Sequence, residues 1–182
     1  MIKYQSTRGS KDVKTAAQAV IRGIAEDRGL YVPDGIPALP KTIEEMTGKT
    51  YKEIAYEIIG AFFTDYTPEE MQACVDGAYD EKFEEAEIVP VKEAAGAYFL
   101  ELYHGRTAAF KDMALSILPH LMTVSAKKNH AEHDIVILTA TSGDTGKAAL
   151  EGFKDVPGTQ IAVFYPEEGV SHMQKRQMMT QE

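Results

Sequence analysis

Two unbroken apolar runs constrain the fold of this chain more than any other feature. The segments DIVILTA (134–140) and TQIAVFYP (159–166) are bounded by turn residues, which is typical of strands buried on both faces. Between them, SGDTGKAALEGF (142–153) has the pattern of a Gly-rich turn followed by a short helix. Strand, helix and strand in this order form the unit of a parallel α/β sheet, so we expect one here.

The first half of the sequence has a helical pattern instead. Apolar residues recur at helical spacing over 13–24 and again over 51–62. TIEE (42–45), upstream of the second helix, resembles a capping box. In TPEE (67–70), a threonine cap followed by proline predicts the start of a third helix, which we expect to run towards Phe83.

The pattern changes near residue 88. IVPVKEAAGAYFLELY (88–103) contains two β-prone runs separated by Ala-Ala-Gly, which predicts a hairpin or a strand pair. Near the end of the chain, Ser171 is a candidate cap for a last helix. We therefore predict a mainly helical domain over 1–87 and a partial α/β domain over 88–182.

Charge and cysteine content exclude several classes of function. The formal net charge of -9 disfavours a nucleic-acid or anionic-membrane surface, because either needs a basic field. Cys74 is the only cysteine, so neither an internal disulfide nor a cysteine metal cluster can form. No run has the length of a signal peptide or a membrane span. A cytoplasmic protein with small-molecule partners is the simplest interpretation.

Two parallel strands need more neighbours than this sequence supplies. Such strands are normally covered by helices on both faces and flanked by further strands. We therefore predict that the chain is a piece of a larger protein. In isolation it is expected to expose apolar area and strand edges, and hence to self-associate.

The turn in TATSGDTGKAAL (139–150) has the composition of an anion site. A strand ends before it, glycines let the backbone bend, and a helix is expected to begin near Thr145 with unpaired amides in its first turn. These amides and the helix dipole attract a carboxylate or a phosphate. The segment fits neither G-x-x-x-x-G-K-[ST] nor G-x-G-x-x-G, which weakens a nucleotide interpretation. An ordinary strand-to-helix turn remains the alternative.

Lys111 stands in an unusual place for a lysine. Ala108, Ala109 and Phe110 precede it and an apolar stretch, 113–118, follows, so it lies at the start of a predicted helix. A helix N-terminus and apolar neighbours both favour a neutral amine. A neutral amine is required to form a Schiff base with an aldehyde cofactor. A solvated surface cation is the ordinary alternative.

These motifs together resemble one enzyme family. HGRTAAFKD (104–112), followed downstream by TATSGDTGKAA (139–149), resembles the threonine synthases, which are pyridoxal-phosphate enzymes of the tryptophan-synthase β-like fold. YQSTRG (4–9), AVIRGIAEDRGLYVP (19–33) and VSHMQKRQMMTQE (170–182) match the same family in the same order. The resemblance therefore covers essentially the whole chain. The family pattern has HGPT where this chain has Arg106 in place of the proline.

The resemblance implies an α/β fold in which a helical N-terminal segment precedes an incomplete parallel three-layer α/β sheet of the fold-type II pyridoxal-phosphate enzymes. Family members are longer, and their C-terminal lobe, which is absent here, supplies the loop for the cofactor phosphate. The implied reaction converts O-phospho-L-homoserine and water to L-threonine and phosphate, the last step of threonine biosynthesis. The isolated chain is expected to be inactive or very weakly active, because cofactor anchoring and substrate closure need both lobes.

The resemblance also implies roles for individual residues. Lys111 would bind pyridoxal 5'-phosphate covalently and act as general base and acid. Phe110 would pack beside the cofactor ring, with plain core packing as its alternative, and Asp144 would lie near the ring hydroxyl. The turn would bind the substrate carboxylate or lie along the cofactor edge, through Thr141, Ser142, Gly143 and Thr145.

Several polar residues remain unassigned at this level. His104 borders the lysine turn and is therefore a functional candidate. The substrate phosphate has four candidate basic partners, which the sequence does not rank: Lys3, Arg8, Arg106 and Lys175. His130 and His133 lie in the polar segment KKNHAEHD (127–134), and no further ligand pattern accompanies them, so we predict a solvated loop and no metal site.

Two alternatives to a threonine synthase stay open. The first is a related pyridoxal-phosphate enzyme that acts on another phosphorylated or sulfonated amino acid. The second is a non-catalytic protein that keeps the fold as a binding module, in which Lys111 would not bond to a cofactor.

Overall fold

The structure is a computed structural model that describes residues 1–181. The chain packs as two compact units, Met1–Gly77 with His120–Ala131, and Ala78–Pro119 with the described residues from Glu132 onward. The first unit therefore takes in a helical segment from the second half of the chain. The division into 1–87 and 88–182 stays a prediction about domain organisation.

The first unit is mainly helical, with one small antiparallel strand pair. Its elements are β1 (Tyr4–Ser6), α1 (Ala16–Arg22), β2 (Tyr31–Pro33), α2 (Ile43–Met46), α3 (Tyr51–Phe62), α4 (Pro68–Ala78) and most of α6 (Leu118–Lys128). In the strand pair, Gln5 lies opposite Val32. The predicted helix over 51–62 is confirmed as α3. The helix expected over 13–24 is confirmed only in its central part, as α1, which follows the Thr15 cap and ends at Arg22.

Capping boxes set the starts of these helices. Thr67 accepts a hydrogen bond from the Glu70 amide at 3.2 Å and donates its own amide to the Glu70 carboxylate at 2.8 Å, which confirms the predicted start of α4. The box at Thr42 is real but caps the separate short helix α2, because α3 has a box of its own at Thr50. Helix α4 ends at Ala78, short of Phe83, where a series of turns begins.

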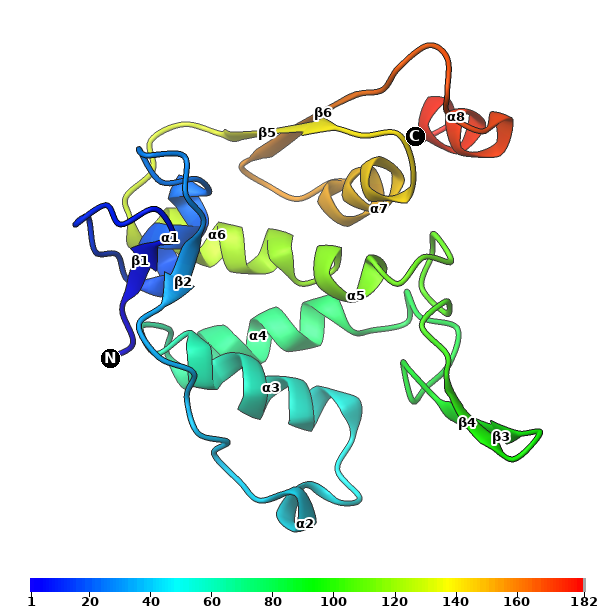
Figure 1. The fold of residues 1–182 in the computed structure, drawn as a ribbon, viewed down its shortest axis with the longest axis horizontal. Coiled ribbons are helices and arrows are strands. Elements are labelled where there is room, and N and C mark those ends of the chain that lie inside the picture. The colour runs from blue at the N-terminus through cyan, green and yellow to red at the C-terminus, as the bar shows by residue number, and fades with distance from the viewer. Residues whose placement is uncertain (182) are drawn as a thin grey trace. The chain divides into compact units, whose positions relative to one another are not determined.

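The core of the first unit lies where α3, α4 and α6 pack together (Figure 1). Val75, Cys74 and Leu121 are buried there. The Tyr66 hydroxyl donates to the Leu121 carbonyl at 2.9 Å and lies 2.6 Å from the Ser125 hydroxyl. Glu70 and Lys128 form an ion pair at 2.8 Å at the edge of this core.

The second unit contains a hairpin, a parallel strand pair and four helical segments. Its elements are β3 (Val91–Ala94), β4 (Ala97–Leu100), α5 (Asp112–Leu115), β5 (Ile135–Ala140), α7 (Asp144–Phe153), β6 (Thr159–Phe164), α8 (His172–Met179) and the first residues of α6. The hairpin, the parallel β5–β6 pair and the Ser171 cap of α8 are confirmed.

The parallel pair is covered on one face only. Helix α7 packs against the face that carries Ile137, Ile161 and Val163 (Figure 1). On the other face Val136 and Leu138 are 57% and 69% exposed. The expectation of strands buried on both faces is therefore wrong for this pair, because no described element of the second unit covers the other face.

The apolar stretch after Lys111 forms two helices rather than one. Helix α5 ends at Leu115, and α6 begins at Leu118 with Pro119 in its first turn. Proline lacks an amide donor and disfavours helical geometry in the residue before it, so a continuous helix cannot pass this point without strain. Lys111 thus precedes a single short turn of helix.

Candidate active site

Lys111 is the N-cap residue of α5 and is half-buried. Its ammonium nitrogen lies 4.5 Å from the centre of the Phe110 ring. Phe110 is 61% exposed, so it is an aromatic surface beside the amine rather than a core residue. Among residues 1–181 the Lys111 amine forms no ion pair. The amine is therefore available to a ligand.

The turn before Lys111 is tied together by Asp112. The Asp112 carboxylate is 5% exposed and accepts two hydrogen bonds from Thr107, from its amide at 2.8 Å and from its hydroxyl at 2.5 Å. Gly105 lies against the same carboxylate, where a Cβ would be 2.4 Å from Oδ2. The sequence did not single out Thr107 or Asp112. The spacing of five residues between them does not indicate that the Asp112 side chain points back towards Thr107.

His104 begins this turn and is also paired. Its Nε2 lies 2.8 Å from a carboxylate oxygen of Glu101, and its ring lies 4.6 Å from that of Tyr103. Hydrogen bonds from His104 and then Tyr103 lower the pKa of Glu101 below its ordinary value. The imidazole is thus oriented by a neighbouring carboxylate.

Arg106 is held at the surface by Glu151 of α7. The guanidinium lies 3.1 Å from the Glu151 carboxylate, which also accepts from Gln181 at 3.0 Å. Burial raises the pKa of Glu151, but the hydrogen bonds from Gln181 and Arg106 outweigh it, so the net pKa is lowered. Because its guanidinium is already paired with Glu151, Arg106 is a weaker candidate for binding a substrate phosphate than the sequence alone suggested.

The 141–145 turn closes on itself through Thr141. The Thr141 hydroxyl accepts from the amides of Gly143 and Gly146 at 3.1 and 3.3 Å and lies 3.2 Å from the Gly143 carbonyl. Gly146 is required here, since a Cβ would lie 2.2 Å from Thr141 Cγ2. The Thr141 hydroxyl thus shapes the turn.

The other residues of the turn face solvent. Ser142, Asp144 and Thr145 are exposed, and α7 begins at Asp144 as expected. Of the first-turn amides of α7, that of Gly146 already donates to the Thr141 hydroxyl and to the Gly143 carbonyl, both at 3.3 Å. The amides before it have no acceptor within the helix itself. Gln174 of α8 donates to the Asp144 carboxylate at 2.9 Å, so α8 lies against this turn. The turn presents amides and hydroxyls of the kind that bind an anion.

The lysine turn and the 141–145 turn belong to the same compact unit. They are connected by packing of α5 on α7, where a Cβ at Gly152 would lie 2.2 Å from the Leu115 carbonyl oxygen. Within the described residues no hydrogen bond or ion pair joins Lys111 to the 141–145 turn. The structure therefore places both motifs on one packed pair of helices.

Two other features lie outside this arrangement. His130 and His133 are exposed, and in the part of the chain that the structure describes no group of three or more potential ligands is placed to hold a metal.

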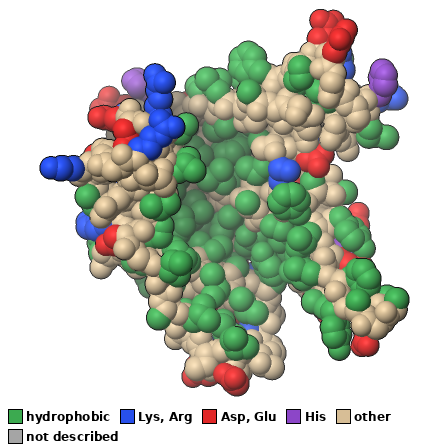
Figure 2. Space-filling model, viewed as in Figure 1, with side chains coloured by type: hydrophobic (Ala, Val, Ile, Leu, Met, Phe, Trp, Pro, Cys, Tyr) green, Lys and Arg blue, Asp and Glu red, His purple; other side chains and the backbone are tan. Residues whose placement is uncertain are grey.

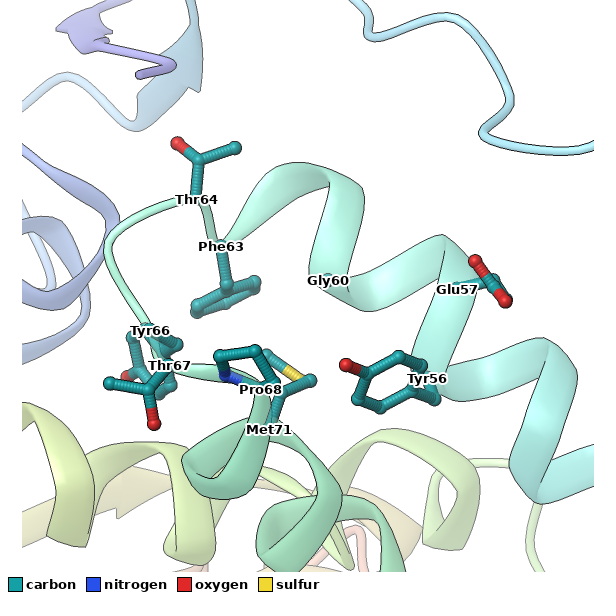
Figure 3. Close-up of a pocket in the computed structure, with 9 residues that line it drawn as sticks. All are labelled: Tyr56, Glu57, Gly60, Phe63, Thr64, Tyr66, Thr67, Pro68 and Met71. Carbon is teal, nitrogen blue, oxygen red and sulfur yellow. The ribbon is translucent and has the colours of Figure 1, made fainter.

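In the first unit an open pocket lies between α3 and the start of α4. Figure 3 shows the rings of Tyr56 and Phe63 turned towards Pro68 and Met71. No sequence pattern indicated this pocket. No helix within residues 1–181 is long and apolar enough to cross a bilayer.

Comparison with known proteins connects this arrangement to one enzyme family. Residues 3–79 match the family model described as threonine synthase N terminus. Threonine synthase from Schizosaccharomyces pombe is 35% identical over 98% of this chain, which covers 37% of that protein. Human threonine synthase-like 1 is 36% identical over 91% of this chain, which covers 23% of that protein.

The same similarity is found in a solved structure. The crystal structure of pyridoxal-phosphate-bound threonine synthase from Brucella melitensis superposes with a TM-score of 0.86 and 35% identity, over 98% of this chain and 38% of that one. The mixed α/β fold and the resemblance to the N-terminal portion of threonine synthases are thereby confirmed. The chain spans little more than a third of the length of the threonine synthases it matches.

Proposed function

We propose that this chain, which matches the N-terminal portion of threonine synthases over nearly its whole length, supplies the cofactor lysine of such an enzyme. The substrates would be O-phospho-L-homoserine and water, and the products L-threonine and phosphate. The observation that carries the proposal is Lys111, half-buried at the start of α5. Its amine lies beside an exposed aromatic ring and forms no ion pair within residues 1–181.

The residues present fit pyridoxal 5'-phosphate. A primary amine can bond to its aldehyde, and the Phe110 ring offers a flat apolar surface within reach of the same atom. When bound, the cofactor supplies an electron sink for loss of phosphate from the γ carbon and addition of water at the β carbon. Asp144, at the start of α7, is proposed to lie near the ring hydroxyl, with its carboxylate held by Gln174.

The chain's own residues then bind and move protons. The Lys111 amine is proposed to take a proton from the substrate and return it, as general base and acid. Ser142 and Thr145 are proposed to bind the substrate carboxylate with the amides of the α7 first turn. Gly143 lets the chain approach the ligand closely, and Thr141 holds the turn in shape.

We also propose a larger sheet and a domain division for the complete enzyme. The β5–β6 pair and its covering helix α7 are taken as part of the parallel three-layer sheet of fold-type II enzymes, with the domain division 1–87 and 88–182. The remaining strands and the anchor for the cofactor phosphate would come from a C-terminal lobe. The cytoplasm is the proposed location, with a single buried thiol, Cys74, consistent with a reducing compartment.

A second candidate function differs only in the substrate. It is a related pyridoxal-phosphate enzyme that acts on another phosphorylated amino acid. The human relative at 36% identity is named threonine synthase-like 1 rather than threonine synthase, which makes this candidate worth testing. The lysine and the anion turn would then keep their roles. Steady-state kinetics on a series of phosphorylated amino acids would separate the two.

A chimera tests the function. The chain replaces the equivalent N-terminal segment of the Brucella melitensis enzyme, and the product is expressed in a bacterium that requires threonine. We expect growth without threonine and phosphate release from O-phospho-L-homoserine, and both should be lost in Lys111→Arg. A folded chimera that retains pyridoxal phosphate but releases no phosphate from this substrate would contradict the proposal.

The isolated chain is expected to self-associate through its uncovered sheet face. Val136, Leu138 and Phe164 are all more than half exposed on that face, and each strand of the pair has one unpaired edge. Apolar side chains of the β3–β4 hairpin are exposed too (Figure 2). A second copy of the chain is the occupant that we propose.

Light scattering over a range of concentrations measures this association. Leu138→Glu, which places a charge at the centre of the exposed face, should shift the average mass towards the monomer. The control is Gln160→Glu, which adds the same charge on the same face without removing apolar area. A monomer at every concentration for the unmodified chain would rule the association out.

A further inference from the structure

We propose that Asp112 and Thr107 are positioning residues that hold the backbone of Lys111 and thereby set the reactivity of its amine. The inference rests on the proposed function of Lys111 and extends it to two residues that touch neither the cofactor nor the substrate. We call the pair of hydrogen bonds from Thr107 to the Asp112 carboxylate the Thr107–Asp112 clasp.

The direction of the Asp112 side chain is the first observation. An aspartate in the first turn of a helix ordinarily faces the free amides of that turn. Here the carboxylate instead accepts two hydrogen bonds from Thr107, which precedes the helix. One carboxylate oxygen receives the amide and the other receives the hydroxyl, so the bond pair is bidentate. Asp112 therefore closes a loop whose last residue is Lys111.

The burial of the carboxylate is the second observation. Asp112 is 5% exposed, and a buried carboxylate is costly unless it is hydrogen-bonded. Loss of the Thr107 hydroxyl would leave one buried oxygen without its partner. Breaking the clasp therefore costs free energy of folding, whereas breaking an ion pair at the surface costs little.

The fit of the surrounding backbone is the third observation. Gly105 provides the space for the carboxylate, because a Cβ there would lie 2.7 Å from Asp112 Cβ as well as 2.4 Å from Oδ2. Ala108, between the two ends of the clasp, has a φ of 53°, a left-handed conformation that costs a non-glycine residue energy. A turn that keeps this conformation must be held by its neighbours.

Lys111 lies between two fixed points as a result. On one side the clasp fixes residues 107–112, and on the other the Lys111 carbonyl accepts from the Leu115 amide at 2.9 Å in the first turn of α5. The backbone of the lysine cannot rotate without breaking one of these contacts. The amine is thus directed by the turn even though its side chain has several rotatable bonds.

The assignment divides the segment HGRTAAFKD into chemical and supporting residues. Lys111 carries the chemistry, whereas Gly105, Thr107 and Asp112 build the turn that presents it. Arg106 and Ala109 take no part in the clasp, so variation at these positions should be tolerated far better than at Thr107.

Three single variants test the clasp: Thr107→Val, Thr107→Ser and Asp112→Asn. Thr107→Val removes only the hydroxyl at nearly constant shape, and Thr107→Ser is its matched control because it restores that hydroxyl. Each chain is incubated with pyridoxal phosphate, reduced with borohydride and digested, and the labelled fraction at each lysine is measured by mass spectrometry. Circular dichroism establishes that each variant is folded.

The expected result is a loss of selectivity. Labelling at Lys111 relative to the other lysines should fall by about fivefold in Thr107→Val, the equivalent of one hydrogen bond, and by more in Asp112→Asn. Thr107→Ser should stay close to the unmodified chain. Folded Thr107→Val and Asp112→Asn chains that label Lys111 as the unmodified chain does would overturn the inference.

A cofactor-independent measurement separates the clasp from the proposed function. Reductive methylation with formaldehyde and cyanoborohydride reports the reactivity of Lys111 as a function of pH without pyridoxal phosphate. The clasp predicts that its pH profile changes in Thr107→Val and returns in Thr107→Ser, and unchanged profiles would overturn it. If methylation shows this difference between the variants but the Brucella melitensis chimera releases no phosphate from O-phospho-L-homoserine, the proposed function fails while the clasp stands.

Discussion

Replacing Gly152 by alanine should lower the free energy of unfolding of the second unit by about 2–3 kcal/mol, because the added methyl group overpacks a closed contact. The new Cβ would lie 2.2 Å from the carbonyl oxygen of Leu115 and 3.0 Å from its carbon. Both atoms belong to the backbone of α5, so no side chain can rotate away. The helix must move off α7, and α5 carries Lys111 at its N-terminus.

Gly60→Ala is the matched control. Gly60 lies within helix α3, and its Cβ would be 3.8 Å from Met71 Cγ, an ordinary contact. With space available, alanine should stabilise the first unit by about 0.5–1 kcal/mol through its higher helix propensity. Urea unfolding monitored by circular dichroism compares the two variants. Equal stability of Gly152→Ala and the unmodified chain would show that α5 does not pack on α7 as described.

The first unit should lose stability steeply in alkaline solution. Burial raises the pKa of the Cys74 thiol from an ordinary 9.0 to about 11, and burial likewise raises the pKa of Tyr66 above its ordinary 10.0. Both residues are at most 9% exposed. Since the folded state keeps these groups neutral, their contribution is complete below pH 9 and is lost as pH rises and the unfolded chain ionises.

The magnitude follows from the two shifts. Between pH 8 and pH 11 the free energy of unfolding should fall by about 2 kcal/mol from Cys74, and Tyr66 adds to this fall in the same direction. Urea unfolding at a series of pH values measures the fall. Cys74→Ala and Tyr66→Phe should each flatten the curve, whereas Tyr98→Phe, at a residue 76% exposed, should not. An unchanged slope in both buried variants would assign the alkaline loss to other groups.

Elements with a strong local pattern could be predicted from the sequence. The alternation of apolar runs with a Gly-rich turn predicted β5, α7 and β6, and the Thr67 box predicted the start of α4. Strands β1 and β2 were missed because three residues are too few to show a period of two. The break between α5 and α6 could have been found from Pro119, which interrupts an otherwise apolar helical stretch.

The reactive residue of the candidate site could be predicted from the sequence, but the contacts that hold it in place could not. Lys111 stood out because an amine among apolar residues at a helix start is unusual, and the resemblance gave it a role. The clasp between Thr107 and Asp112 depends on the path of the backbone, which sequence spacing does not reveal. Pairing of Arg106 with Glu151 joins residues far apart in the chain, so it too required the fold.

The central claim, that Lys111 is the amine that bonds to pyridoxal phosphate, is tested most directly on the unmodified chain. The chain is mixed with pyridoxal phosphate, reduced with borohydride and digested, and the cofactor-bearing peptide is identified by mass spectrometry, with Lys111→Arg as the control. Selective labelling of Lys111 over the other lysines, lost in the variant, is the predicted result. Labelling spread evenly over the surface lysines, unchanged in Lys111→Arg, would contradict it.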